Sequence, residues 1–295
     1  ILASIYDAKY ISVVVCFVAF LVNDIYGFVN WCKMKKNRII IKKVQIMEQK
    51  LIAKGGTADI FDLGNGTIFK RFHDDKNDYC IESEIQCTSS KVAIALGAPQ
   101  ILERVNDERG RGFIMENIRG QTMLEKMFVQ GADFDIKENA QIMAQLQYKI
   151  SKFEGKDFPS GHDVMKERIL QSSFLDDAEK NHVLKILDSL PQGTSVCHSD
   201  LHPANIIITE SGEYRVIDWC DTMCDSPLLD VARTLLIYKS VAPMPGTNLE
   251  DLNKSRVAWY YFYKSAWENL AGTSEDELNK WLAVLAAVKL AESDS

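Results

Sequence analysis

The residues that could carry chemistry gather in one stretch, residues 196–221, which reads VCHSDLHPANIIITESGEYRVIDWCD. Two short apolar segments, NIIIT and YRVID, flank the turn sequence ESGE and predict a β-hairpin. Polar residues stand at the strand ends: Asp200 and Asn205 at the first, and Asp218 after the second. Because a hairpin brings its open ends together, we expect the Asp218 carboxylate to lie near Asn205, with Asp200 on the loop beside them.

These three side chains suit a reaction on phosphate. A carboxylate and an amide offer hard oxygen ligands, which Mg²⁺ prefers, so Asn205 and Asp218 are the predicted metal ligands. Asp200 then lies near the metal and is free to accept a proton. One group that orients a nucleophile and two that hold metal on phosphates are the parts that phosphoryl transfer needs. The alternative is an ordinary turn with solvated carboxylates, and the combined spacing favours function over it.

The sequence motifs around these residues resemble those of a known family. The spacing Asp200-x4-Asn205-x12-Asp218 is similar to the pattern of protein kinases. HSDLHPANI, VIDW and DSPLLDVAR resemble the aminoglycoside phosphotransferase family of kinase-like enzymes, which reads H-G-D-x-H-x-x-N and then I-D-W or I-D-F. The resemblance is specific in these words and weaker over about residues 50–240. It implies an α+β, two-lobed, protein-kinase-like fold and ATP-dependent phosphorylation of a small molecule's hydroxyl.

The resemblance also implies a role for each residue of the loop. Asp200 is the catalytic base on the substrate hydroxyl, and the two predicted metal ligands hold Mg²⁺. His198 and His202 brace the catalytic loop through hydrogen bonds. Ser199 departs from the family pattern because it replaces the usual Gly, and we expect it to stiffen the loop.

Lys70 is the candidate contact to the nucleotide phosphates. It lies in TIFKRF, a predicted strand, and an apolar strand rarely points a Lys inward without a partner. The resemblance implies that it contacts the α- and β-phosphates of ATP and pairs with a helix Glu, while Arg71 faces the other side of the strand. Glu82 and Glu84 are the candidate partners, and Glu84 is preferred because the family often places this Glu second in an E-x-E pair. A surface Lys is the alternative.

Two further segments are expected at the nucleotide. The loop AKGGTADIF, with Gly55, Gly56 and Thr57, takes the position of the loop that covers the phosphates, and Gly-Gly lets the backbone approach them. The segment FIMENIRG takes the position of the hinge, where Glu116 and Ile118 would offer backbone groups to an adenine edge. A plain hairpin turn and an uninvolved strand end are the alternatives.

The first part of the chain supplies the sheet that must position Lys70. Three short strands are predicted within residues 48–72, a helix over 78–97 and a hairpin within 100–120. Together they predict a small antiparallel sheet with one helix, a nucleotide-binding lobe over residues 47–116.

The rest of the chain, residues 117–295, is predicted to form a larger and mostly helical lobe for catalysis and substrate binding. Apolar residues at helical spacing predict its helices. These helices cover residues 135–153, 176–190, 227–241, 248–272 and 273–293.

Composition sets outer limits on function. The chain has 295 residues, enough for two lobes, and its net charge of −7 argues against a nucleic-acid-binding surface. The seven cysteines form no Cys-x-x-Cys, so we expect free thiols in a reducing, cytoplasmic setting.

The N-terminal extension, residues 1–46, is ambiguous. An apolar run over residues 10–22 precedes the basic sequence CKMKKNR, but extending it to the roughly 20 residues that span a bilayer includes Asn23 and Asp24. A membrane anchor over residues 10–31 is one interpretation, and an interfacial or packed helix is another. A leader that is not part of the working protein, with Met34 or Met47 as the natural start, is the third.

The sequence indicates a class of acceptor but no single one. The segment between Asp218 and LLDVAR is too short to hold a peptide, which argues against a protein substrate. An aminoglycoside, another amino alcohol such as choline or homoserine, and a sugar remain open. The aromatic helix AWYYFYKSAWENL is a candidate wall, with Glu268 as a candidate partner for a cationic amine, but aromatic residues at helical spacing more often form a core. The alternatives from other classes are a nucleotide-binding pseudoenzyme that acts by interaction and a membrane-tethered regulator.

Overall fold

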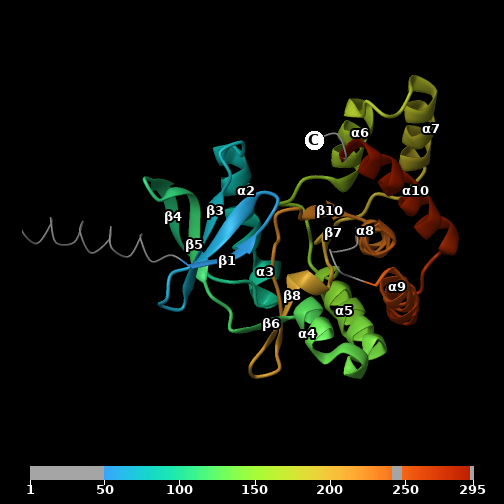
Figure 1. Cartoon of the computed structure of the whole chain (residues 1–295). Coiled ribbons are helices and arrows are strands. Elements are labelled where there is room, and N and C mark those ends of the chain that lie inside the picture. The colour runs from blue at the N-terminus through green and yellow to red at the C-terminus, as the bar shows by residue number, and fades with distance from the viewer. Residues whose placement is uncertain (1–49, 241–247, 293–295) are drawn as a thin grey trace, which may run out of the picture.

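The computed structural model describes residues 50–240 and 248–292, which form two lobes side by side (Figure 1). A β-sheet with a short helix makes the smaller lobe, and a larger group of helices makes the other. The α+β, two-lobed arrangement predicted from the sequence is confirmed. The predicted extension over residues 1–46 lies outside the described residues. No helix within the described ranges is long and apolar enough to cross a membrane.

A five-stranded antiparallel sheet forms the smaller lobe, with strand order β1-β2-β3-β5-β4. Lys70 on β3 is opposite Phe113 on β5, so the central strand places the lysine in the middle of the sheet. The turn between β2 and β3 uses Gly64 and Gly66, both at positive φ (73° and 80°), as the sequence LGNG predicts. The strands are β1 (Lys50–Lys54), β2 (Ala58–Asp62), β3 (Thr67–Phe72), β4 (Ile101–Asp107) and β5 (Gly110–Glu116).

The single helix predicted over residues 78–97 is wrong, because two helices fill this segment. α2 (Asp78–Thr88) ends before Ser89, and α3 (Lys91–Ala95) starts after Ser90. Ser90 has extended backbone dihedrals, and its side chain accepts a hydrogen bond from the Ala93 N–H at 3.3 Å. A serine that caps a helix competes with continuing the previous one, so the Ser89–Ser90 pair divides the segment.

The larger lobe contains the five helices predicted there, at α5, α7, α8, α9 and α10, and two more that the periodicity did not indicate, at α4 and α6. The bounds are α4 (Met123–Gln130), α5 (Ile136–Ile150), α6 (Gly161–Gln171), α7 (Asp177–Asp188), α8 (Pro227–Ser240), α9 (Leu249–Ala271) and α10 (Glu275–Glu292). Two small sheets lie among them, β6-β8-β9 and β10-β7. Their strands are β6 (Gly120–Thr122), β7 (Ser195–Cys197), β8 (Ile206–Thr209), β9 (Tyr214–Val216) and β10 (Met223–Asp225).

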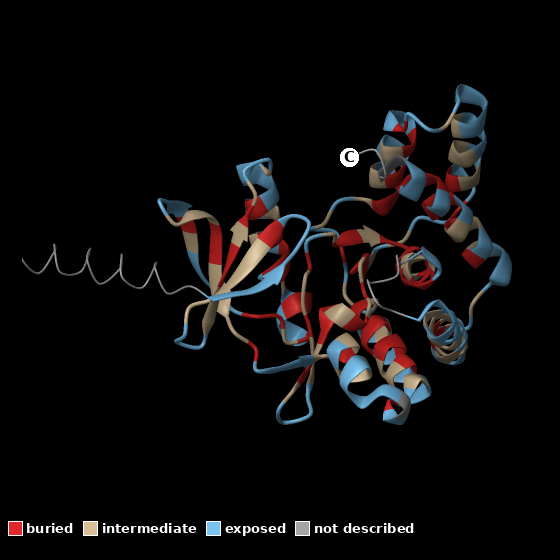
Figure 2. Ribbon diagram, in the orientation of Figure 1, coloured by how far each residue is buried: buried red, intermediate tan, exposed pale blue. Residues whose placement is uncertain are grey.

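Each lobe has its own hydrophobic core. A small cluster in the sheet lobe contains Phe72, Ile81 and Phe113, while a much larger one fills the helical lobe. Figure 2 shows the buried positions gathering on α5 and α8. Val92 and Ala93 of α3 belong to the larger core although α3 precedes the last two strands of the sheet lobe. The chain therefore crosses between the lobes before residue 117.

An ion pair between Arg215 and Glu116 joins the two lobes at the end of strand β5. Arg215 on β9 donates to both carboxylate oxygens of Glu116 at the end of β5, at 2.8 and 3.0 Å. The same guanidinium donates to the Gly97 carbonyl at 2.6 Å, and the Val216 N–H donates to the Leu96 carbonyl at 2.9 Å. The bidentate pair fixes orientation as well as contact, so it sets how β5 and β9 face each other.

We predict that Glu116→Gln lowers the free energy of unfolding by about 1 kcal/mol or less, because the pair is partly exposed. The Arg215 hydrogen bonds hold the pKa of Glu116 below its ordinary value. The stabilisation is therefore fully present above the unfolded pKa of about 4.3 and is lost as the pH falls through the lower, folded pKa.

Denaturant unfolding of wild type and variant between pH 7 and pH 3 checks this. The stability difference should be constant at neutral pH and should disappear in acid. Glu210→Gln, which removes an exposed carboxylate from the β8–β9 turn, is the control. A difference that is the same at pH 7 and pH 3 would show that the ion pair does not cause the loss.

Candidate active site

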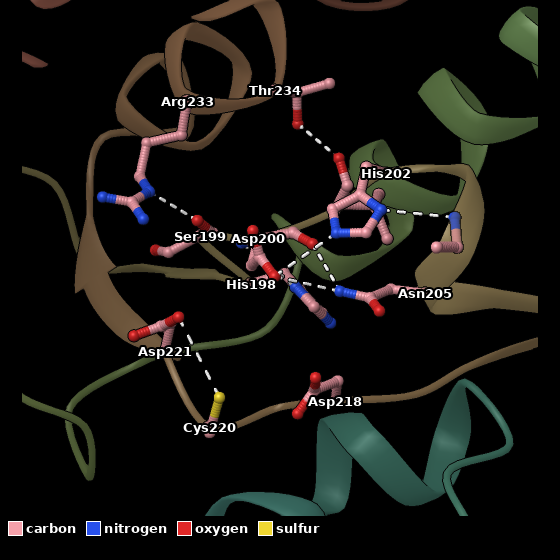
Figure 3. Close-up of polar contacts among 12 residues, drawn as sticks. His198, Ser199, Asp200, His202, Asn205, Asp218, Cys220, Asp221, Arg233 and Thr234 are labelled. Atoms are coloured by element: carbon pink, nitrogen blue, oxygen red, sulfur yellow. Dashed lines mark hydrogen bonds and ion pairs between the residues drawn. The ribbon is translucent and has the colours of Figure 1, made fainter. Parts of the chain in front are cut away.

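The β8–β9 hairpin brings the three predicted polar residues to one end. Ile206 is opposite Val216, and the Ile217 N–H donates to the Asn205 carbonyl at 3.0 Å. The strand pairing therefore continues to the position before Asp218. Figure 3 shows the side chains of Asp200, Asn205 and Asp218 on the same side of the loop.

Asp200 is held in place by Asn205. The Asn205 side-chain amide donates to the Asp200 carbonyl at 2.9 Å and to its carboxylate oxygen Oδ2 at 3.1 Å. His202 Nε2 lies 3.5 Å from the same Oδ2. The Asp200 side chain keeps 30% of its surface exposed, so an approaching molecule can still reach it.

The residues present fit a hard cation such as Mg²⁺. Because the amide nitrogen of Asn205 is used on Asp200, the amide oxygen is the end left for a cation. The side chain of Asp218 is 37% exposed and offers carboxylate oxygens beside it. Within the described ranges, the ligand atoms of Glu84, Asp218 and Cys220 also lie within 4.8 Å of one another. The Lys70 ammonium already contacts Glu84 and Asp218, so the positive charge beside these three residues is supplied by the lysine.

Lys70 lies between two carboxylates from different lobes. Its Nζ is 2.5 Å from Glu84 Oε1 on α2 and 3.2 Å from Asp218 Oδ1 after β9. Burial works to lower the pKa of Lys70, but the two carboxylates more than offset it, so the pKa is raised and the ammonium stays charged. Burial likewise opposes ionisation of Asp218, and Lys70 outweighs it, so the pKa of Asp218 is lowered.

Glu82 and Arg71, which lie close in the sequence to Glu84 and Lys70, form ion pairs with other residues. Glu82 is exposed and binds Arg104 at 2.7 Å, so Glu84 is the residue that meets Lys70, as the family resemblance implied. Arg71 pairs with Asp59 at 3.5 Å and lies over the Phe61 ring. The alternation of a strand separates these two basic residues.

Two site residues have a backbone conformation that side chains disfavour. Ser199 has a φ of 66° and Asp218 a φ of 63°, and they are the two such residues other than glycine in the described ranges. A residue with a Cβ loses roughly 1 kcal/mol in this region. The positive φ gives a physical reason for the Gly that the resembled family has at the position of Ser199.

The sequence reasoning missed Asp230, which holds the loop that carries Asp200. It lies on α8, it is buried, and its carboxylate accepts from the backbone N–H groups of His198 at 3.0 Å and Ser199 at 2.7 Å. Arg233, one turn further along α8, donates to the Ser199 carbonyl at 2.5 Å. An acidic residue inside the apolar helix PLLDVARTLL was the available signal, since a buried carboxylate needs donors.

The two loop histidines make hydrogen bonds of the bracing kind that was predicted. His198 donates from Nε2 to the Ile217 carbonyl at 3.2 Å and accepts from the Asp200 N–H at Nδ1, at 3.3 Å. Its ring packs against Trp219 with centroids 4.7 Å apart. His202 accepts from the Ala204 N–H at 3.2 Å, so its Nε2 proton points toward Asp200.

The predicted phosphate loop is a turn at the edge of the sheet. The Gly55 N–H donates to the Ala58 carbonyl at 2.9 Å, and a Cβ on Gly55 would lie 2.9 Å from that oxygen. Gly56 and Thr57 are exposed, and the Thr57 carbonyl accepts from the His73 N–H at 3.0 Å. The backbone here is therefore accessible, while Gly55 is confined by the turn.

The predicted hinge keeps only part of its backbone free. The Glu116 N–H donates to the Gln100 carbonyl at 2.9 Å, so this N–H is not available to an adenine edge, and the carbonyl is what Glu116 can offer. The next N–H, on Asn117, donates to the Gly66 carbonyl at 2.9 Å. Ile118, which follows, is buried at the junction of the lobes.

The aromatic helix α9 contributes more to the core than to a binding wall. Trp259, Tyr263 and Trp267 are each at most 2% exposed and belong to the large hydrophobic cluster. Glu268 is already paired with Lys264 at 2.5 Å, so its carboxylate is not a free partner for an amine.

Comparisons with known proteins agree with the resemblance drawn from the sequence. Residues 133–271 match the phosphotransferase enzyme family. A thermostable mutant of aminoglycoside phosphotransferase APH(4)-Ia shares the fold at 15% identity and a TM-score of 0.57, covering 83% of this chain and 87% of that one. Aminoglycoside phosphotransferase APH(3'')-Id from Streptomyces rimosus matches at 14% identity and a TM-score of 0.52, covering 81% and 92%. At these identities the likeness shows the kinase-like fold.

The backbone at Ser199 yields a stability prediction. Ser199→Gly relieves the disfavoured φ but makes the unfolded chain more flexible, and these effects are each about 1 kcal/mol. The free energy of unfolding should therefore stay within about 1 kcal/mol of the wild type. Ser199→Val should lose about 2 kcal/mol or more, because a β-branched residue is strained most at this φ.

Denaturant unfolding of the three proteins measures both changes. Equal destabilisation by Gly and Val would mean that the serine hydroxyl matters here and the backbone conformation does not.

Proposed function

We propose, from the phosphotransferase-family match and the kinase-like fold, that this chain is an ATP- and Mg²⁺-dependent O-phosphotransferase acting on a small hydroxylated molecule. The observation that carries the proposal is the meeting of two groups at the junction of the lobes. One is Lys70 with Glu84 and Asp218, and the other is Asp200 with Asn205. Residues 47–116 would bind the nucleotide, and residues 117–295 would bind the acceptor and carry out the transfer.

The nucleotide end of the site follows from the charges. The Lys70 ammonium, oriented by Glu84, is the donor for the α- and β-phosphates. The backbone of Gly56 and Thr57 is accessible at the edge of the sheet to cover the phosphates. The Glu116 carbonyl and the backbone of Ile118 would contact the adenine edge.

Asn205 and Asp218 would hold the metal ion, which neutralises charge on the phosphates when bound. Asn205 has its amide oxygen free for this purpose because its nitrogen is used on Asp200. The Lys70 contact keeps Asp218 ionised, which a metal ligand requires.

The transfer step uses Asp200 as the base. Its carboxylate accepts the proton of the acceptor hydroxyl as the acceptor oxygen bonds to the γ-phosphorus and the bond from that phosphorus to ADP breaks. Asn205 and His202 hold the carboxylate in one orientation, which lowers the entropic cost of the step.

The acceptor classes that we propose are an aminoglycoside, another amino alcohol and a sugar. The structure of APH(3'')-Id from Streptomyces rimosus in complex with ADP and streptomycin shares the fold at a TM-score of 0.50 and 14% identity. It shows that this fold accommodates a nucleotide and a small acceptor together.

Lys70→Met should weaken ATP binding by roughly tenfold to a hundredfold, the typical worth of a charge-assisted hydrogen bond. Arg71→Met is the matched control, because it removes a cation from the adjacent position on the opposite face of β3. Isothermal titration with ATP and Mg²⁺ measures both. Similar losses in the two variants would contradict a direct role for Lys70.

Asp200→Asn should lower acceptor-dependent turnover by roughly 10²–10⁴-fold, since the base is lost, and should leave ATP binding intact. The assay is Mg²⁺-dependent ADP release with pooled aminoglycosides, choline and other amino alcohols, and sugars. ADP release that needs one acceptor and collapses in the variant is the expected result. ATP binding without transfer to any acceptor would favour the pseudoenzyme instead.

A further inference from the structure

An apolar pocket of about 190 Å³ borders His202, Pro203 and Ala204, which follow Asp200 on the loop. It is enclosed by α4, α8, α9 and the 3₁₀ turn η2 (Pro203–Asn205), which follows Asp200. Figure 1 shows α4 beside β8, and α8 beside α9. Met127, Leu252 and Trp259 supply much of its wall. No Asp or Glu is among the described residues that line it.

Arg256 is the charged group of this pocket. Its Nη1 donates to the Asn253 side-chain oxygen at 3.3 Å, one turn earlier on α9. Its Nε and Nη2 are both buried and meet no hydrogen-bond acceptor among the residues that the structure describes. Nε–H and Nη2–H point the same way along one edge of a guanidinium, so the unsatisfied edge is the fork that binds carboxylate or phosphate with two parallel hydrogen bonds.

The side chain of His202 lies between the pocket and Asp200, the predicted base. His202 lines the pocket, and its Nε2 lies 3.5 Å from Asp200 Oδ2. A molecule held in the pocket is therefore separated from the Asp200 carboxylate by a single imidazole ring. The other groups of the lining near this ring, Pro203 and Ala204, belong to the catalytic loop itself.

We propose that this pocket is an acceptor subsite that selects for an oxyanion. The acceptor would carry a carboxylate or a phosphate group on a short apolar body, with the oxyanion on the free edge of Arg256 and the hydroxyl directed past His202 to Asp200. Buried N–H groups without an acceptor are costly, as at Nε and Nη2 of Arg256, and an oxyanion in the pocket removes that cost. The inference rests on the proposed phosphotransfer to a small hydroxylated molecule, and it names hydroxylated acids as the acceptor class in place of the aminoglycosides, other amino alcohols and sugars.

The same observations argue against a cationic group in this pocket. An ammonium would meet the Arg256 guanidinium in an apolar enclosure, where like charges repel more strongly than in water. A polyamine acceptor could occupy the other side of Asp200, but it would leave the free edge of Arg256 unsatisfied.

Binding to the full chain without nucleotide tests the pocket by itself. The probes are butanoate, 4-hydroxybutanoate, benzoate, 4-(hydroxymethyl)benzoate and phenyl phosphate. The amide of each carboxylic acid is its neutral counterpart, and phenol is that of phenyl phosphate. The variants are Arg256→Gln and Arg256→Lys, which keeps the charge but not the fork. Lys254→Gln is the matched control, because it removes an exposed cation from the same helix without touching the pocket.

We expect at least one acid to bind tenfold or more tightly than its amide in the wild type and in Lys254→Gln. The preference should disappear in Arg256→Gln and be weakened in Arg256→Lys. The carboxylate and phosphate arms identify which oxyanion fits. The proposal is overturned if no oxyanion binds better than its neutral counterpart, or if Arg256→Gln keeps the preference.

ADP release separates this proposal from the proposed function. Phosphorylation of a bound hydroxy acid, lost in both Asp200→Asn and Arg256→Gln, is the expected result. Transfer to some other acceptor, with none to any hydroxy acid bound at Arg256, would overturn the acceptor role of the pocket. Absence of transfer to every acceptor would contradict the proposed function instead.

Discussion

The arrangement of the whole site depends on one buried cation. Lys70 is 8% exposed at the centre of the sheet lobe, and Glu84 and Asp218 both face its ammonium and favour its charged form. Glu84 comes from the same lobe and Asp218 from the other. Leaving such a charge with fewer partners costs several kcal/mol. The relative position of the lobes, the orientation of α2 and the carboxylate after β9 are thus linked through a single ammonium group.

The second constraint is on the backbone at the two ends of the β8–β9 hairpin. Positive φ at Ser199 and Asp218 turns the chain sharply on both sides of the hairpin. Such conformations persist only where the surroundings impose them. Asp230 does so at Ser199, by accepting from two successive N–H groups, while Lys70 holds the side-chain carboxylate of Asp218 itself. The polar groups meet at one place because helix α8 and strand β3 each fix one of the two turns.

Structure formed by residues close together in the sequence could be predicted from the sequence, whereas most contacts between distant elements could not. The hairpin and the meeting of Asn205 with Asp218 follow from strand pairing, which is local. The choice of Glu84 over Glu82 came from the family resemblance, and the salt bridge to Lys70 agrees with it. The bonds from Asp230 to the loop and from Arg215 to Glu116 join residues 31 to 99 positions apart, and no periodicity reports such a separation. The split of α2 and α3 was missed because Ser90, within the polar run Thr88–Lys91, was not recognised as the cap of a new helix.

The environment of Arg256 also could not be predicted from the sequence. Its position on a helix predicted from the sequence was known, but its unsatisfied edge depends on how α9 packs against α4 and α8. The packing of three helices decides whether a cation on one of them is solvated or enclosed. In the proposed function, acceptor selectivity is therefore assigned to the helical lobe, and the phosphate chemistry to the junction between the lobes.

The most direct test of the central claim is a crystal structure of the full chain with a non-hydrolysable ATP analogue and Mg²⁺. We predict the triphosphate beside the Lys70 ammonium and a metal ion about 2.1 Å from the Asn205 amide oxygen and an Asp218 carboxylate oxygen. The γ-phosphate should face Asp200. A nucleotide bound elsewhere, or one bound with no metal ion on Asn205 and Asp218, would contradict the assignment of this site to phosphoryl transfer.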